Sequence, residues 1–194
     1  MIEHIAKMAE IGQKGLESKS MYDPDKKVLK DVRTNESKYS EQYNPDNKVP
    51  KWKDEIKQKT GWPNEIVDFI STPEQCDIYE KANLSPSIIN GRQCLIKSID
   101  LGYVDPKTGM TNRELMQRGR APIDSKTGEK IELHHMNQDK DAPFAELCEN
   151  SEHGDGNDLV LHDKSKPSWR RDPAANEAYK TEKKNHWKTR AMEA

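Results

Sequence analysis

The stretch EKIELHHMNQDKDAP, residues 129–143, decides how the second half of this chain folds. Apolar and polar side chains alternate up to two adjacent histidines, and turn-forming residues follow. This pattern predicts a strand over residues 130–135 and a loop over residues 137–143. Residues 144–148, FAELC, are predicted to return as an antiparallel partner strand. Because neighbouring side chains on a strand point to opposite faces, we expect the two histidines to serve different purposes.

Four of the six histidines lie in this part of the chain, at His134, His135, His153 and His162. A strand, a loop, a second strand and a short helix can bring these positions together. Imidazole nitrogens commonly hold divalent metal ions, with positions left open for water or substrate. A metal ion stabilises charge on a phosphodiester transition state, and a metal-free histidine can take a proton from the attacking water. Paired histidines also occur by chance on surfaces, so spacing alone leaves both interpretations open.

The segments before these histidines predict mainly helices. Thr72 and Thr111 each begin a helix with a capping-box pattern, and residues 51–59 form another helix that ends at Gly61. Residues 94–104 predict a strand or a buried extended segment. We divide the chain into residues 1–50, an N-terminal helix followed by a polar linker, and residues 51–194, the main domain.

The composition predicts a small core. Hydrophobic residues make up 32% of the chain and charged residues 34%, with a net charge of −2. Basic residues nevertheless predominate after Lys164, where Asp172 and Pro173 predict the start of a long helix. Such a basic segment either attracts a polyanion or is simply a solvated helix face.

The cysteines and the apolar runs exclude several classes of protein. Three widely spaced cysteines are neither a disulfide framework nor a CxxC metal pair, so we expect buried free thiols. No apolar run approaches the ~18 residues that a membrane-spanning helix needs. The first residues lack the continuous apolar core of a signal peptide, so any export is expected to depend on another element.

The histidine region also resembles a known family. The resemblance rests on Ile131 to Gln138, Ala145 to Leu147, Glu152 to Gly154, Gly156-Asn157 and Leu161 to Asp163. It continues upstream to about Thr60 and downstream through His186 to Arg190. These residues look like the LHH branch of the HNH/endonuclease VII, or ββα-metal, nuclease superfamily. The resemblance implies an α+β fold, in which a mostly helical domain surrounds a ββα-metal core and ends in a long basic helix.

The resemblance also implies roles for the site residues. His134 and His162 match metal ligands, and His135 matches the general base that activates water. His153 stands where the family usually has an asparagine, so it either orients His135 or joins the metal. Glu132 is a ligand, a contact behind a ligand or a solvent-facing acid. One divalent ion is implied, with Zn, Mg, Mn and Ni all open.

Further residues are expected to bind nucleic acid or to support the fold. Phosphate contacts are predicted for Arg170, Arg171, Lys183, Lys184, Lys188 and Arg190, with little base specificity. Asn157 is expected to cap a short helix, and His186 is expected at the surface of the last helix. His4 lies outside the resemblance.

The function implied is metal-dependent, largely non-specific cleavage of DNA. Members of this branch are typically C-terminal toxin domains of bacterial polymorphic toxins. The resemblance therefore implies an antibacterial toxin released from a larger secreted protein, active in the target-cell cytoplasm and neutralised by a cognate immunity protein. Two alternatives remain at this point. One is a non-enzymatic, metal-stabilised module that binds nucleic acid or protein, and the other is cleavage of RNA by the same fold.

Overall fold

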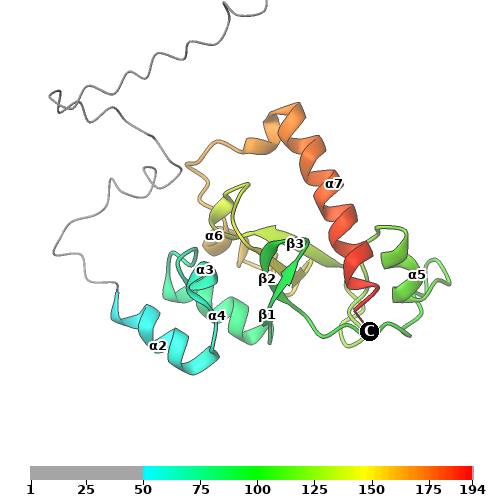
Figure 1. The fold of residues 1–194 in the computed structure, drawn as a ribbon, viewed down its shortest axis with the longest axis horizontal. Helices are drawn as coiled ribbons and strands as arrows, with labels where there is room; N and C mark the ends of the chain where they lie inside the picture. The colour runs from blue at the N-terminus through cyan, green and yellow to red at the C-terminus, as the bar shows by residue number, and fades with distance from the viewer. Residues whose placement is uncertain (1–49, 194) are drawn as a thin grey trace, which may run out of the picture. The chain divides into compact units, whose positions relative to one another are not determined.

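The computed structural model describes residues 50–193 of the chain. The interpretation of residues 1–49 as a helix and polar linker lies outside the described residues. The described part is a mixed α+β fold, which confirms the expected fold class, and it contains a four-stranded sheet and six α-helices (Figure 1). None of its helices is both long and apolar enough to cross a bilayer.

The sheet joins two antiparallel hairpins through one parallel pairing. Its strands run in the order β1-β2-β4-β3. Their bounds are Ser85–Ile89 for β1, Arg92–Ile96 for β2, Ile131–His135 for β3 and Phe144–Cys148 for β4. The parallel contact pairs Cys94 of β2 with Phe144 of β4. In the second hairpin, His135 pairs with Phe144 and His134 with Ala145, so the predicted antiparallel hairpin is confirmed.

Three helices begin at the residues that the capping signals indicate. Thr72 accepts a backbone hydrogen bond at the start of α4, and Thr111 forms a complete capping box with Glu114 at the start of α5. Asp172 accepts hydrogen bonds from two backbone N–H groups of α7. The helices are α2 (Lys51–Thr60), α3 (Asn64–Val67), α4 (Pro73–Lys81), α5 (Asn112–Gln117), α6 (Asp158–Leu161) and α7 (Pro173–Arg190), with 3₁₀ turns η1 (Met136–Gln138) and η2 (Trp169–Arg171).

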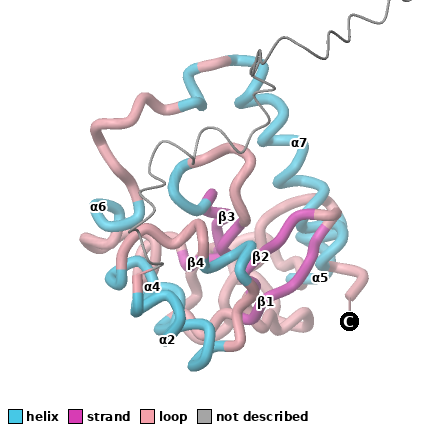
Figure 2. Tube along the Cα trace, turned by 60° about the vertical axis from the view of Figure 1, so that its left-hand side comes forward, coloured by secondary structure: helices cyan, strands magenta, loops and turns pink. Residues whose placement is uncertain are grey.

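Two apolar clusters cover opposite faces of the sheet. Leu95 and Ala145 pack with residues of α2, α3 and α4, whereas their chain neighbours Cys94 and Phe144 pack with α7 around the fully buried Trp187. The strands lie between these helical groups in Figure 2. Because β4 is buried on both faces, the second hairpin is fixed within the core, and its histidines occupy defined positions.

Three details differ from the expectations. The extended segment predicted over residues 94–104 is a strand only to Ile96, and the preceding strand β1 was not predicted. Asn157 stands at the N-cap of α6, but its side chain donates to the carbonyl of Glu152 instead of capping the helix.

All three cysteines are free and buried, which confirms the expected thiols.

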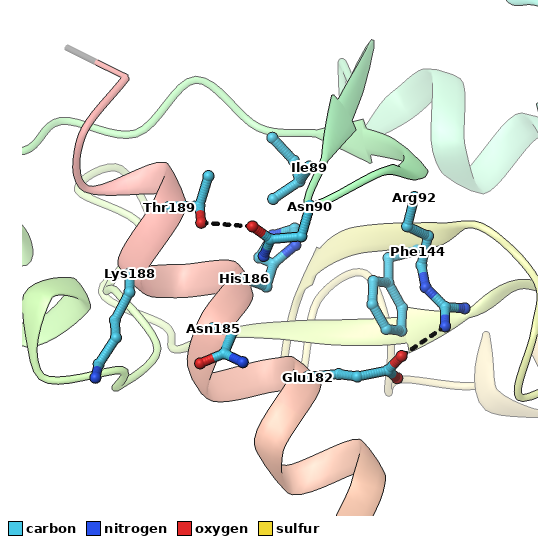
Figure 3. A pocket seen from close by; sticks show the side chains of 9 residues that line it. All are labelled: Ile89, Asn90, Arg92, Phe144, Glu182, Asn185, His186, Lys188 and Thr189. Atoms are coloured by element: carbon cyan, nitrogen blue, oxygen red, sulfur yellow. Dashed lines mark hydrogen bonds and ion pairs between the residues drawn. The ribbon is translucent and has the colours of Figure 1, made fainter.

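His186 is also placed differently from the expectation. It is 2% exposed, and its Nε2 lies 2.7 Å from Oε1 of the buried Glu146. Figure 3 shows His186 on α7 among the residues that line a cavity of about 430 Å³. The prediction of a surface residue was wrong because a carboxylate on β4 offers a buried partner that the helix sequence does not reveal.

Candidate metal and nuclease site

Three imidazoles meet beside the second hairpin. His134 comes from β3, His153 from the turn after β4, and His162 from the C-cap of α6. Their ring centroids lie 5.0 to 5.2 Å apart. One ligand nitrogen from each ring lies within 4.8 Å of the others. The ββα unit thus brings together three of the histidines that the sequence singled out.

Two imidazole nitrogens of the triad have no hydrogen-bond partner among the described residues. Nε2 of His134 and Nε2 of His153 are buried and have no hydrogen-bond partner there. Leaving buried polar atoms unpaired is costly, so such atoms call for an explanation. A divalent cation held by neutral imidazoles satisfies both nitrogens, which means that the residues fit a metal ion.

Two contacts behind the triad set which nitrogen of each ring is free. Nδ1–H of His153 donates to Oε2 of Glu132 over 3.2 Å, and Nδ1–H of His162 donates to the carbonyl of Asp158 over 3.1 Å. Each bond leaves Nε2 as the lone-pair nitrogen. Glu132 therefore lies behind a ligand nitrogen, an arrangement common around metal-binding histidines.

Burial and nearby charges set the protonation states of the triad and of Glu132. Burial lowers the pKa of His134 well below its usual value, and the nearby His153 lowers it further. Burial also lowers the pKa of His162. The hydrogen bond from His153, together with the charge of Lys130, lowers the pKa of Glu132 to about 2. At neutral pH both shifted imidazoles are neutral, as metal ligation requires, and the carboxylate is ionised.

His135 points to the other face of β3 and packs among aromatic rings. The centroids of Phe144, Trp169 and Tyr179 lie 4.6 to 4.8 Å from its ring. Neither of its nitrogens has a hydrogen-bond partner among the described residues. Burial, followed by the charges of Arg92 and Arg170, lowers its pKa to about 3, so it is neutral at pH 7. Its ring orientation is set by packing.

One cavity nevertheless reaches both faces at the end of β3. It has a volume of about 160 Å³ and is lined by all four histidines, together with Gln138, Trp169 and Arg170. The guanidinium of Arg170 lies 4.8 Å from the centroid of Tyr179. The cavity therefore combines a candidate metal-binding triad, a neutral imidazole without a hydrogen-bond partner among the described residues, and a cation, which are groups that phosphodiester hydrolysis can use.

The other predicted phosphate-binding residues are spread over η2 and α7. Arg171, Lys184 and Lys188 are exposed, and Lys183 is half-buried with Nζ 5.6 Å from the centroid of Tyr179. Arg190 points inward instead. It donates to Oε1 of Glu146 over 3.0 Å and to the carbonyl of Lys97 over 2.7 Å. Arg190 is therefore occupied within the fold.

Sequence reasoning missed Gln138, Trp169 and Arg92 as site residues. Gln138 belongs to the quoted stretch, and its Oε1 accepts a hydrogen bond from the backbone of Asp163, next to the third histidine. Trp169 lines the cavity with Gln138, and Arg92 lies 4.6 Å from the centroid of Phe144. Gln138 could have been predicted as a site residue because it lies three positions after the histidine pair. The other two are placed by tertiary packing and carry no local signal.

The architecture places a possible three-histidine metal site within a ββα unit. Residues 111–193 match the model of a family described as LHH, a nuclease of the HNH/ENDO VII superfamily with conserved LHH. The matched segment contains Leu133-His134-His135 and the whole ββα unit. It supports nuclease activity in this part of the chain, whereas the resemblance upstream of residue 111 lies outside it. No solved structure matches the chain.

Proposed function

We propose that this chain is a metal-dependent endonuclease that hydrolyses phosphodiester bonds of DNA with little sequence preference. The observation that carries this proposal is the shared cavity at the end of β3. It holds three imidazoles around one point and a fourth that has no partner among the described residues. The family match over residues 111–193 supports the same reaction class.

The proposed metal ligands are His134, His153 and His162. Their donor set, three imidazole nitrogens, suits Zn²⁺ or Ni²⁺ better than Mg²⁺, which prefers oxygen ligands. When bound, such an ion supplies positive charge that stabilises a phosphodiester transition state. The proposed role of His153 is therefore that of a ligand, with Glu132 fixing its ring from behind.

His135 is the proposed general base. It lines the cavity, and its nitrogens are free to accept a proton from water. Its low pKa keeps it unprotonated at neutral pH, and the three surrounding rings hold the imidazole in place. Arg170 is proposed to bind the scissile phosphate at the rim of the same cavity.

The proposed path of the nucleic acid follows η2 and the outer face of α7. Arg171, Lys184 and Lys188 are exposed there and are proposed to contact phosphates. Lys183 is proposed to join them from the edge of the Tyr179 ring. Backbone contacts of this kind position a duplex without reading bases, which favours cleavage with little sequence preference.

The biological context is a further part of the proposal. We infer an antibacterial toxin domain that is released from a larger secreted protein, acts in the target-cell cytoplasm and is neutralised by a cognate immunity protein. This inference is supported by the resemblance of the histidine region to toxin nucleases. Induced expression in a bacterium should then arrest growth and degrade DNA, whereas His135→Ala should do neither.

A plasmid-cleavage assay tests the reaction itself. Purified protein is incubated with plasmid DNA in EDTA or with Zn²⁺, Ni²⁺, Mn²⁺ or Mg²⁺, beside a matched His135→Ala variant. Cleavage that requires metal and is lost in the folded, metal-loaded variant supports the proposal. Intact DNA under every ion excludes it, and a parallel RNA substrate decides between the two nucleic acids.

A non-enzymatic module with a structural metal is the competing function. Structural zinc sites are normally closed by four protein ligands. Among the described residues the clustered potential ligands are three histidines, with His135 on the opposite strand face. A metal ion held by three protein ligands would leave a coordination position for water or substrate, which favours catalysis. If His135→Ala abolished metal binding as well as cleavage, the structural module would become the better account.

A further inference from the structure

The turn that carries His153 lies outside the helices and strands of the fold. It spans residues 149–157, between β4 and α6. A metal ligand on such a turn needs its backbone fixed by other contacts, because only a narrow range of positions suits coordination. The backbone N–H of His153 donates to the carbonyl of Cys148 over 2.9 Å, which ties the ligand to the end of β4.

Glu152, the residue before this ligand, is held from two sides. Its Oε2 accepts a hydrogen bond from the backbone N–H of Cys148 over 2.7 Å. Its Oε1 accepts from Nζ of Lys97 over 2.6 Å. The carboxylate therefore clamps the turn back onto β4 and onto the segment that follows β2.

Lys97 is an unusual residue for that place because it is only 8% exposed. Its Nζ also donates to the carbonyl of Ala82 over 3.3 Å, at the end of α4. Its backbone N–H donates to Glu146 on β4, and its carbonyl accepts from Arg190 on α7. Lys97 is thus hydrogen-bonded to α4, β4 and α7. Through its ion pair with Glu152 it also restrains the turn that carries His153.

The ring and the backbone of His153 are consequently fixed by separate acids. Glu132 on β3 holds the imidazole through Nδ1, whereas Glu152 holds the turn. Lysine and glutamate are rarely buried unless they are paired, and removal of one partner leaves an uncompensated buried charge. Because this ion pair restrains the residue directly before a candidate ligand, it can determine the position of that ligand.

We propose that Lys97 and Glu152 form a partly buried ion pair that positions His153 for metal binding. The inference rests on the proposed metal site and is independent of the proposed DNA cleavage. Both are positioning residues, since neither contributes an atom to the histidine triad. Neutralising Glu152 should loosen the turn, so His153 leaves the triad for part of the time and the affinity for metal falls.

The test is a metal titration of the full chain with Zn²⁺ and Co²⁺, by competition with a chromophoric chelator. Glu152→Gln is expected to weaken binding about 10–100-fold, the usual effect of losing a contact behind a ligand. The visible absorption of the Co²⁺ form should also change, because one imidazole is less firmly held. Stability alone would not alter that spectrum.

Glu80→Gln provides a matched control. Glu80 pairs with Lys59 over 2.7 Å, and its side chain is 20% exposed, as is that of Glu152. Glu80 lies on α4 and outside the histidine triad, so this variant should bind metal as the unaltered chain does.

A double variant covers the case in which Glu152→Gln alone fails to fold. Lys97→Met with Glu152→Gln removes both charges and leaves no unpaired ion, and it should fold yet still bind metal weakly. Unaltered affinity and an unaltered Co²⁺ spectrum in a folded variant would overturn the inference. An unaltered chain that binds no metal would overturn it together with the metal site. Absence of DNA cleavage would remove the nuclease proposal alone, since cleavage is not part of this measurement.

Discussion

Replacement of His153 by asparagine separates two roles for this residue. As a metal ligand, His153 supplies Nε2 to the triad, and asparagine lacks that nitrogen and has a shorter side chain. As a residue that orients His135, it would be replaced without loss of activity, because asparagine usually stands at this position in the nucleases that the histidine region resembles. The structure places its ring 5.2 Å from that of His134 and 5.0 Å from that of His162, which favours the ligand role.

The expected loss follows from the number of ligands. Structural zinc sites with four ligands bind with about 10–16 kcal/mol, so each ligand contributes about 2.5–4 kcal/mol. Removal of one ligand should therefore weaken zinc binding about 10²–10³-fold. Cleavage by His153→Asn should recover as the metal concentration is raised, because His135 and Arg170 remain in the cavity.

The assay combines a chelator-competition titration with plasmid cleavage over a range of metal concentrations. His186→Asn is the control, because it also removes a buried imidazole but lies outside the triad. It should leave metal affinity unchanged in the folded protein. The ligand assignment is refuted if His153→Asn binds zinc within about threefold of the unaltered chain but cleaves at no metal concentration.

Three further substitutions and one labelling experiment test other parts of the structure. Arg170→Ala should weaken DNA binding and reduce the salt dependence of log K by about 1, measured by fluorescence anisotropy at several salt concentrations. Arg190→Ala should instead lower the free energy of unfolding by about 3 kcal/mol in urea, because it takes a cation from the buried Glu146. Asp172→Ala should cost about 1 kcal/mol by the same measurement, because two N–H groups at the start of α7 lose their acceptor. Burial raises the pKa of the three thiols to about 11 or 12, so iodoacetamide at pH 8 should label them only after unfolding, as mass spectrometry can detect.

Local signals predicted the parts of the fold that local interactions stabilise. The alternation in residues 129–135 and the apolar run after the loop specified the β3–β4 hairpin, because strand periodicity and turn residues act over short distances. The caps at Thr72, Thr111 and Asp172 are likewise contacts between residues close in sequence. These signals were sufficient to locate the ββα core.

Non-local pairing was not predictable in the same way. Strand β1 has the sequence SPSII, in which proline and serine weaken the strand pattern, although Asn90-Gly91 is a recognised hairpin turn. The parallel contact between β2 and β4 joins residues about fifty positions apart and has no signature in either strand. Pairings of this kind depend on how the two hairpins dock around the core.

The sequence indicated which histidines would lie together, but not which other side chains would surround them. The spacing of the histidines indicated a metal centre. The hydrogen bond between His153 and Glu132 was not predictable, because it depends on the conformation of the turn at residues 149–157. On α7, His186 and Arg190 look like surface residues in the sequence, yet both meet Glu146 inside the fold. Both side chains turn inward because Glu146, on β4, is a buried partner. The sequence of the helix alone does not reveal that partner.

The turn after His135 contains two residues in a strained conformation, and one of them lines the cavity that the histidines share. Asn137 and Gln138 both have positive φ angles, 52° and 57°, which cost non-glycine residues roughly 1–2 kcal/mol each. Cross-links compensate: Asn137 accepts hydrogen bonds from Ser71 and Lys166, and Gln138 accepts one from the residue after His162. The resulting sharp turn ends β3 at the histidine pair and brings Gln138 to the cavity wall. The strained residues of this turn therefore lie at the candidate site, where neighbouring contacts hold them in place, as is common at functional sites.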